Sequence, residues 1–158
     1  MTCATPPRGA APVGFIEDLN AVEAGAVHFL RLWSDGPDAQ ARIRRDFITV
    51  LGAEHGQRAL DAFQALFEIC ARHGRRPLMR HDVACRCLGA DESCFATVLG
   101  YASEGAREDA MLLAASFVRP DMAGALAGLA EEVGLALRRM SLIRAAPSAD
   151  CDRAVMLH

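Results

Sequence analysis

Residues 120–143 read PDMAGALAGLAEEVGLALRRMSLI, and this stretch decides the fold class. Its larger apolar side chains recur every three to four residues, which is the pattern of one face of an α-helix. The members of this stripe are Met122, Leu126, Leu129, Val133, Ala136 and Met140. We therefore predict a long amphipathic helix whose apolar stripe faces the protein core.

Small residues also occupy this helix and weaken its intrinsic propensity. Gly124, Gly128 and Gly134 should each cost about 1 kcal/mol relative to alanine inside a helix. Because something must offset that cost, we expect another helix to pack closely against the small residues. Gly124 and Gly128 also form a G-x-x-x-G motif. We expect the neighbouring helix to come from the same chain, with a second copy in a homodimer as the alternative.

The same helical period continues upstream of this stretch. It predicts helices over residues 15–33, 37–51, 55–72, 81–88 and 91–103, and a further helix that contains residues 110–117. No segment alternates apolar and polar residues with strand chemistry, so we expect no sheet. Six or seven short helices joined by short turns predict an all-α protein, built as a compact bundle or an orthogonal array.

Two predicted corners have similar sequences. They read Leu51-Gly52-Ala53-Glu54 and Leu88-Gly89-Ala90-Asp91. In each, the glycine stands where the end of a helix needs a positive φ, and an acid follows where the next helix begins. We expect two tight helix-to-helix corners, although four residues are too few to indicate a duplicated repeat.

Length and composition predict one domain with a flexible segment at each end. The chain has 158 residues, of which 52% are hydrophobic, and this is enough to form one packed core. Residues 1–14 contain three prolines and two glycines, so we expect a flexible arm there. The helical domain is predicted over residues 15–143, and residues 144–158, which lack a period, as a flexible tail.

Charge and cysteine content narrow the classes of partner and compartment. The net charge of −3 is too small to indicate a strongly acidic or basic partner. All 17 basic residues are arginine, which excludes Schiff-base chemistry and a P-loop lysine. We interpret the six cysteines as reduced thiols, because a chain this apolar can do without a disulfide framework. With no signal-peptide core and no run of about 18 apolar residues, we expect no membrane partner and a cytoplasmic location.

The most unusual segment is arginine-rich. Residues 72–91 read RHGRRPLMRHDVACRCLGAD, and their arginines are Arg72, Arg75, Arg76, Arg80 and Arg86. Guanidinium groups bind carboxylate and phosphate, so this segment predicts contact with a small anion or with a protein partner. Nucleic acid is disfavoured, because no aromatic residues are interleaved with the arginines. In the structural alternative, these arginines cap helix carbonyls and pair with acids such as Glu68, Asp82, Asp91 and Glu92.

Thiols and imidazoles in the same segment predict an alternative function, the binding of zinc or iron. The candidate ligands are His81, Cys85, Cys87 and Cys94, with His73 in place of Cys94 as a variant. His81 and Cys85 would share one face of a helix, whereas Cys85 and Cys87 would share one side of an extended chain. The H-x3-C-x-C spacing is not a common zinc signature, and buried thiols also fill gaps between helices.

No constellation of residues supports an enzyme. The chain contains no G-x-S-x-G motif and no glycine-rich phosphate loop. We expect no cofactor apart from the zinc alternative. The sequence thus predicts a non-enzymatic helical protein that acts through protein or anion contacts at its arginine-rich segment.

Overall fold

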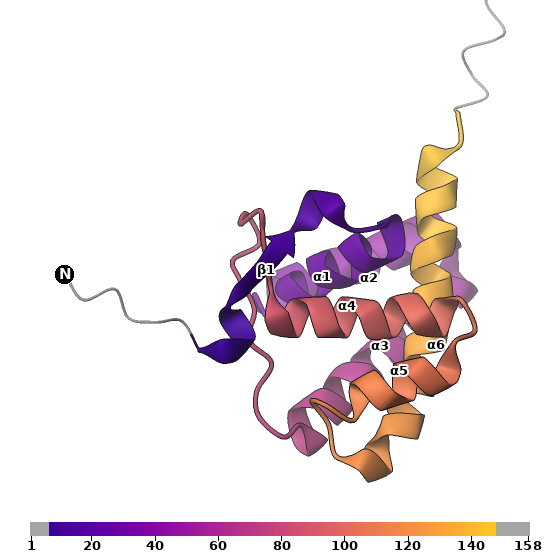
Figure 1. The fold of residues 1–158 in the computed structure, drawn as a ribbon. Helices are drawn as coiled ribbons and strands as arrows, with labels where there is room; N and C mark the ends of the chain where they lie inside the picture. The colour runs from indigo at the N-terminus through magenta and orange to yellow at the C-terminus, as the bar shows by residue number, and fades with distance from the viewer. Residues whose placement is uncertain (1–6, 148–158) are drawn as a thin grey trace, which may run out of the picture.

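The computed structural model describes residues 7–147 and confirms the all-α class. The described residues contain six α-helices, two short 3-10 helices and one two-stranded sheet. In chain order the elements are η1 (Arg8–Ala10), β1 (Pro12–Phe15), η2 (Ile16–Asp18), α1 (Ala21–Trp33), α2 (Pro37–Leu51), α3 (Ala53–His73), β2 (Cys87–Gly89), α4 (Ala90–Ser103), α5 (Arg107–Ala114) and α6 (Pro120–Ala145). In Figure 1, α6 crosses α4, so the helices form an array rather than a bundle of parallel axes.

Helix α1 begins later than its apolar pattern predicts. Asn20 caps it, because the Asn20 side chain accepts a hydrogen bond from the Glu23 N–H at 2.9 Å. The Glu23 carboxylate in turn accepts from the Asn20 N–H at 3.4 Å, which completes a capping box. The predicted start at residue 15 is therefore wrong, and Phe15 lies in β1 with 51% of its surface exposed.

Of the two predicted corners, the structure contains only the first. Gly52 joins α2 to α3 with a φ of 84°, a conformation that glycine adopts without strain. Gly89 has a φ of −80° and is the last residue of β2. A side chain at this position would collide with the His81 ring, since a Cβ there would lie 2.9 Å from His81 Cε1. Gly89 therefore allows the close approach of a ring and does not end a helix.

The expectation of no sheet is wrong, because β1 and β2 pair antiparallel with Gly14 opposite Leu88. The Ala90 N–H donates to the Ala11 carbonyl at 3.0 Å, and the Ile16 N–H donates to the Arg86 carbonyl at 3.0 Å. The part of the predicted arm within the described residues thus packs onto the helical domain. Such pairing uses backbone groups, and an apolar pattern does not report it. Residues 1–6 and 148–158 lie outside the described residues, and α6 reaches Ala145.

The core lies where α6 meets α1, α3, α4 and α5. Five phenylalanine rings form a connected cluster with Trp33 at its edge, and the rings belong to Phe29, Phe47, Phe63, Phe67 and Phe95. In the stripe of α6, Leu126, Val133 and Met140 are buried. Within residues 7–147, no helix combines the length and the apolar character that crossing a bilayer requires.

The predicted close neighbour of α6 comes from the same chain. A Cβ at Gly134 would lie 2.7 Å from the Leu99 carbonyl oxygen and 2.8 Å from Ser103 Cβ, so the backbones of α4 and α6 touch there. Gly124 and Gly128 face only side-chain ends from α5, at 3.6 Å from Met111 Cε and 3.5 Å from Arg107 Nη2. The intramolecular neighbour is thereby confirmed, and the homodimer stays a prediction.

Candidate functional site

The candidate site is the connector, which we define as residues 74–86 between α3 and β2. The predicted helix over residues 81–88 is wrong, since this part of the chain forms turns and then enters β2. The connector begins against the link between α5 and α6, because the Arg75 N–H donates to the Phe117 carbonyl at 2.9 Å. The Arg119 N–H likewise donates to the His73 carbonyl at 2.9 Å. Backbone bonds therefore hold the first residues of the connector in place.

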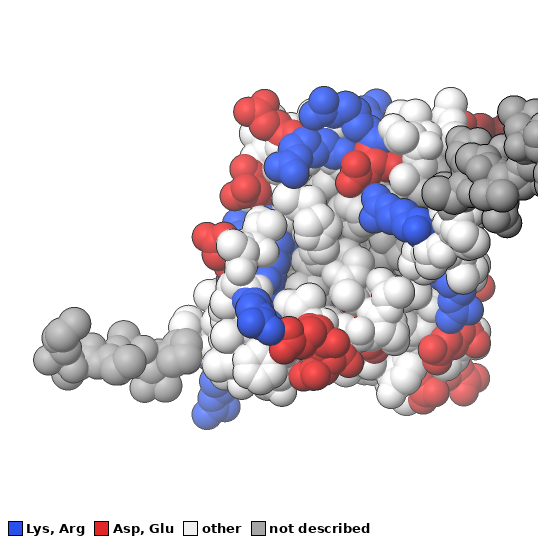
Figure 2. Space-filling view, turned by 90° about the horizontal axis from the view of Figure 1, so that it is seen from above, with Lys and Arg blue, Asp and Glu red and all other residues white. Residues whose placement is uncertain are grey.

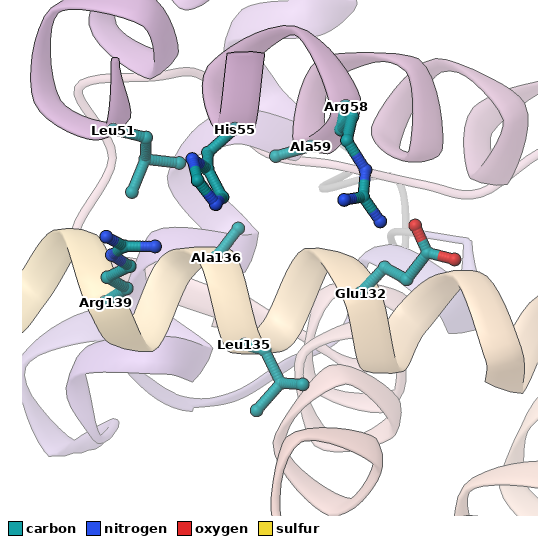
Figure 3. A pocket seen from close by; sticks show the side chains of 8 residues that line it. All are labelled: Leu51, His55, Arg58, Ala59, Glu132, Leu135, Ala136 and Arg139. Carbon is teal, nitrogen blue, oxygen red and sulfur yellow. The ribbon is translucent and has the colours of Figure 1, made fainter.

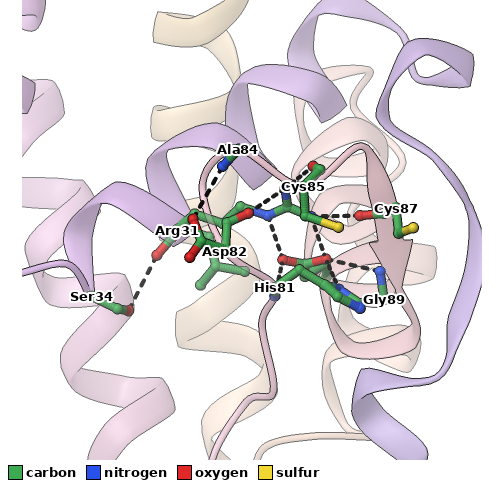
Figure 4. Close-up of polar contacts among 10 residues, drawn as sticks. Arg31, Ser34, His81, Asp82, Ala84, Cys85, Cys87 and Gly89 are labelled. Atoms are coloured by element: carbon green, nitrogen blue, oxygen red, sulfur yellow. Dashed lines mark hydrogen bonds and ion pairs between the residues drawn. The ribbon is translucent and has the colours of Figure 1, made fainter. Parts of the chain in front are cut away.

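Arg31 of α1 holds the other end of the connector. Its side chain is buried, with a residue exposure of 2%. Its Nε and Nη2 donate to the two carboxylate oxygens of Glu92 at 2.7 and 2.9 Å. The remaining N–H groups donate to the carbonyls of Asp82, Cys85 and Cys87 at 3.0, 2.6 and 2.7 Å (Figure 4). The five donors of this guanidinium thus have five acceptors. Residues 82–87 are not helical because three of their carbonyls point at Arg31.

Glu92 of α4 is the acidic partner in this buried cluster, with an exposure of 0%. It also accepts from the Gly89 N–H at 2.8 Å and from the His81 N–H at 2.9 Å, and it contacts His81 Nδ1 at 3.0 Å. Burial by itself would raise the pKa of Glu92, but the bonds from Arg31, Gly89 and His81 outweigh it and hold the pKa at about 2. The carboxylate is therefore charged throughout the neutral range.

The sequence predicts Glu92 as an acidic partner for the arginines of the connector, but it does not single out Arg31. A usable signal is present in α1, where Arg31 follows Val27 by four residues and so shares the helix face of a buried side chain. An arginine on such a face must find several acceptors, because an unpaired charge in the interior is costly.

Two of the predicted binding arginines form ion pairs within the chain. Arg76 donates through both Nη atoms to Asp91 at 2.6 and 2.7 Å, and the Met79 N–H donates to the same carboxylate at 2.8 Å. Burial would raise the pKa of Asp91, but these bonds outweigh it and lower the pKa. Arg86 pairs with Glu17 at the surface. The predicted structural alternative, in which the arginines of this segment pair with nearby acids, is right for Arg76 and Asp91. Asp82 and Glu92 meet Arg31 of α1 instead, Asp82 through its backbone carbonyl and Glu92 through its carboxylate.

Two other arginines use only part of their donor groups. The Nε of Arg75 donates to the carbonyls of Ala115 and Val118 at 3.1 and 3.3 Å. The Nη2 of Arg80 donates to the Ser34 carbonyl at 3.1 Å. Within residues 7–147, no acceptor meets the Nη groups of Arg75 or the Nε and Nη1 groups of Arg80. Both guanidinium groups therefore keep N–H groups for a ligand.

The fifth predicted arginine, Arg72, is exposed in the last turn of α3. It stands apart from the cavity described next, whose lining contains Arg75, Arg76 and Arg80. Arg72 therefore provides a matched control for experiments on the other arginines.

A cavity of about 520 Å³ lies between the connector, α1 and α3. Arg75, Arg76 and Arg80 line it together with an apolar set of residues, namely Leu30, Phe67, Cys70, Ala71, Pro77 and Leu78. Burial raises the pKa of the Cys70 thiol to about 12, so this thiol is neutral at physiological pH. The cavity thus combines arginine donors with an uncharged lining. We call it the connector cavity.

The predicted metal ligands do not converge. Cys85 and Cys87 are neighbours, and the Cys85 thiol raises the pKa of Cys87 and thereby favours its protonated form. His81 bonds to Glu92, and Cys94 lies on α4, where burial and then the nearby charge of Asp91 raise the pKa of its thiol. Among residues 7–147, no three His, Cys, Asp or Glu side chains lie close enough together to hold a metal ion.

A second pocket of about 290 Å³ lies between α3 and α6. Figure 3 shows the Arg58 guanidinium directed toward the Glu132 carboxylate across this pocket. An acid of the chain itself therefore already faces this arginine. Arg139 is then the one arginine of this pocket that no acid faces in Figure 3, whereas both Arg75 and Arg80 line the connector cavity, which is therefore the better candidate for a ligand anion.

On the face of the molecule seen from above, charges of one sign do not gather into a large patch that would attract an anion from a distance. In the face seen from above, basic and acidic side chains are interspersed around an uncharged, hollowed centre (Figure 2). Recognition of an anion must therefore depend on local donors such as Arg75 and Arg80.

Compared with models of protein families, with curated proteins and with solved structures, the chain gives no match.

Proposed function

We propose that this protein is a non-enzymatic binding protein, and that its connector cavity holds the anionic group of a small ligand. Arg75 and Arg80 would bind that group. One observation carries the proposal: both arginines line the same cavity, and both keep N–H groups that the described residues do not use. Guanidinium groups recognise carboxylate and phosphate through such donors.

The fixed backbone of the connector supports this proposal. Arg31 holds the carbonyls of Asp82, Cys85 and Cys87, and the Arg76–Asp91 pair holds the middle of the connector to α4. A loop that is already in place loses less conformational entropy when a ligand binds. Arg76 and Arg86 then have structural roles, and Arg72 lies outside the cavity lining. Of the five predicted binding arginines, Arg75 and Arg80 remain as the candidates for ligand binding.

The concave shape of the site favours a small ligand over an acidic patch on a partner protein. Small-molecule sites are concave and mostly apolar, with a few placed polar groups. We also propose that the protein acts in the cytoplasm. The four cysteines that the structure describes are free thiols, which agrees with a reducing compartment.

Titration with inorganic phosphate and with acetate tests the proposal. The amide N–H chemical shifts of residues 74–76 and 78–80 in the full chain should change and saturate. The double variant Arg75→Ala/Arg80→Ala should lose this saturation, whereas the control Arg72→Ala should keep it. Equal losses in both variants would show only a general charge effect and would refute a site at Arg75 and Arg80. If an acidic peptide gave saturable shifts but phosphate and acetate did not, the result would favour a protein partner instead.

Zinc or iron binding at His81, Cys85 and Cys87 is the alternative function that the sequence predicts. The described geometry gives it no support, because no three His, Cys, Asp or Glu side chains among residues 7–147 lie close enough together to hold a metal ion. Metal analysis of protein purified without a histidine tag separates the two functions. Stoichiometric metal in the unmodified chain that is lost in Cys85→Ser would favour metal binding. If the unmodified chain contains no metal, the metal-binding function is refuted.

A further inference from the structure

The lining of the connector cavity indicates what kind of anion it would take. We infer that the ligand is an amphiphilic carboxylate, with its carboxylate at Arg75 and Arg80 and a hydrocarbon portion against the apolar lining. This inference rests on the proposed anion binding at the two arginines. It adds the chemical class of the rest of the ligand.

Charged and apolar residues of the cavity differ in burial. Arg75 and Arg80 are exposed, whereas Leu30 and Cys70 are buried. The donors therefore lie toward solvent, and the part of the apolar lining that Leu30 and Cys70 form lies toward the protein interior. A ligand with one charged end and one apolar end would match both parts in a single orientation.

Most polar side-chain atoms of the other lining residues are already committed, although no acceptor among residues 7–147 meets the Nε of Arg76. The Ser34 hydroxyl donates to the Leu30 carbonyl at 3.2 Å, and both Nη atoms of Arg76 bond to Asp91. The Cys70 thiol is neutral because burial raises its pKa to about 12. Away from Arg75 and Arg80, the side chains of the lining offer a ligand chiefly apolar contact. Such a lining is a poor match for a sugar or another ligand that is polar along its whole length.

Size is the second argument for a ligand larger than a bare ion. A volume of about 520 Å³ lies in the range of small-molecule sites, which is roughly 300–1,000 Å³. A bare carboxylate or phosphate would leave the apolar lining in contact with water. Each methylene that becomes buried is worth about 0.8 kcal/mol, which corresponds to about a fourfold gain in affinity.

A homologous series of carboxylates tests the inference. Acetate, butyrate, hexanoate and octanoate would be titrated into the full chain, with octanol as the uncharged control. The single tryptophan, Trp33, provides the signal, because its ring lies 5.6 Å from the ring of Phe67, which lines the cavity. We expect the dissociation constant to fall by about fourfold per added methylene, and octanol to bind more weakly than octanoate.

The outcomes separate this inference from the proposed function. Equal affinity for acetate and octanoate, with both lost in Arg75→Ala/Arg80→Ala, would overturn the amphiphile and leave anion binding in place. Equal affinity for octanoate and octanol, unchanged in the double variant, would overturn the anion site itself. No saturable signal or shift with any member of the series would overturn both.

A cavity-filling variant provides an independent readout. Ala71 lines the cavity but is exposed, so a larger side chain can enter without displacing the core. Ala71→Phe should remove the chain-length dependence while acetate still binds, and its thermal melting should stay close to that of the unmodified chain. Undiminished chain-length dependence in this variant would place the hydrocarbon elsewhere and overturn the inference.

Discussion

Arg31 and Glu92 show how a buried ion pair can hold a loop that contains no regular structure. Moving two charges out of water costs several kcal/mol per ion, and only complete hydrogen bonding offsets that cost. The pair meets this condition, because Arg31 has five acceptors and Glu92 also accepts from Gly89 and His81. The bonds that satisfy Arg31 also determine where the connector backbone lies.

Replacing Glu92 by glutamine should therefore be strongly destabilising. Glu92→Gln removes the negative charge and leaves Arg31 buried without a counter-charge, so we expect a loss of about 3–5 kcal/mol. Urea unfolding measures the change. The control is Glu17→Gln, which breaks an ion pair whose side chains are 58% exposed for Glu17 and 76% for Arg86. An exposed pair contributes little to stability, so equal losses in the two variants would contradict the role of the buried pair.

The depressed pKa of Glu92 predicts how stability depends on pH. The pKa is about 2 in the folded protein against an ordinary value of 4.5, so the folded state binds fewer protons than the unfolded state between these values. The stabilisation is present in full above about pH 4.5 and is lost as the pH falls toward 2, by an amount on the order of 3 kcal/mol.

Urea midpoints measured from pH 7 down to pH 2 test this dependence. The unmodified chain should lose more stability in acid than Glu92→Gln, since the variant has no carboxylate at this position. Parallel curves for the two proteins would show that another group causes the acid sensitivity.

At the scale of elements, α6 is the helix on which the others assemble. Its glycines look equivalent along the sequence, but the packing makes them different. Gly134 lies against the backbone of α4, whereas Gly128 lies against the flexible end of Arg107. The same substitution at the two positions should therefore change stability in opposite directions.

Gly134→Ala should destabilise the protein by about 1–3 kcal/mol, because its Cβ would lie 2.7 Å from the Leu99 carbonyl oxygen. Gly128→Ala should raise the melting temperature instead, since alanine is favoured over glycine in a helix by up to about 1 kcal/mol. Thermal unfolding followed by circular dichroism measures both. A stabilising Gly134→Ala would show that α4 and α6 do not touch there.

The helices also show where the local pattern of apolar residues is sufficient to predict secondary structure and where it fails. Helix α2 over Pro37–Leu51 agrees with its prediction, and α3 and α4 differ by one or two residues at their ends. Each of these helices carries its own period and breakers. The predicted helix over residues 81–88 fails because its carbonyls bond to Arg31 on α1, which no local pattern can indicate.

At the scale of the whole molecule, the N-terminal segment completes the environment of the connector. Strand β1 pairs with β2, and Gly9 lies so close to Asp91 and Arg76 that a Cβ there would collide with both. The Ala90 N–H at the start of α4 donates to the Ala11 carbonyl at 3.0 Å. The first residues of a helix lack intrahelical acceptors, so this bond protects an otherwise unsatisfied donor.

Deleting residues 1–15 should therefore speed hydrogen exchange at the Ala90 amide, while the amides in the middle of α6 keep their protection. Exchange measured residue by residue by NMR tests this. Deletion of residues 1–6 is the control, and it should leave the Ala90 amide protected. If both deletions left the exchange at Ala90 unchanged, the sheet would not contribute to holding the connector.

The sequence by itself determined the helical class and most helix positions, since the period of apolar residues and the breakers between helices are local properties. It also identified the arginine-rich segment, though not which arginines are committed. Only the tertiary structure decided that Arg31 and Glu92, which are 61 residues apart, meet in the interior, and that Arg75 and Arg80 line one cavity. The physical reason is that burying a charge depends on acceptors supplied by distant parts of the chain, and these acceptors meet only when the helices pack.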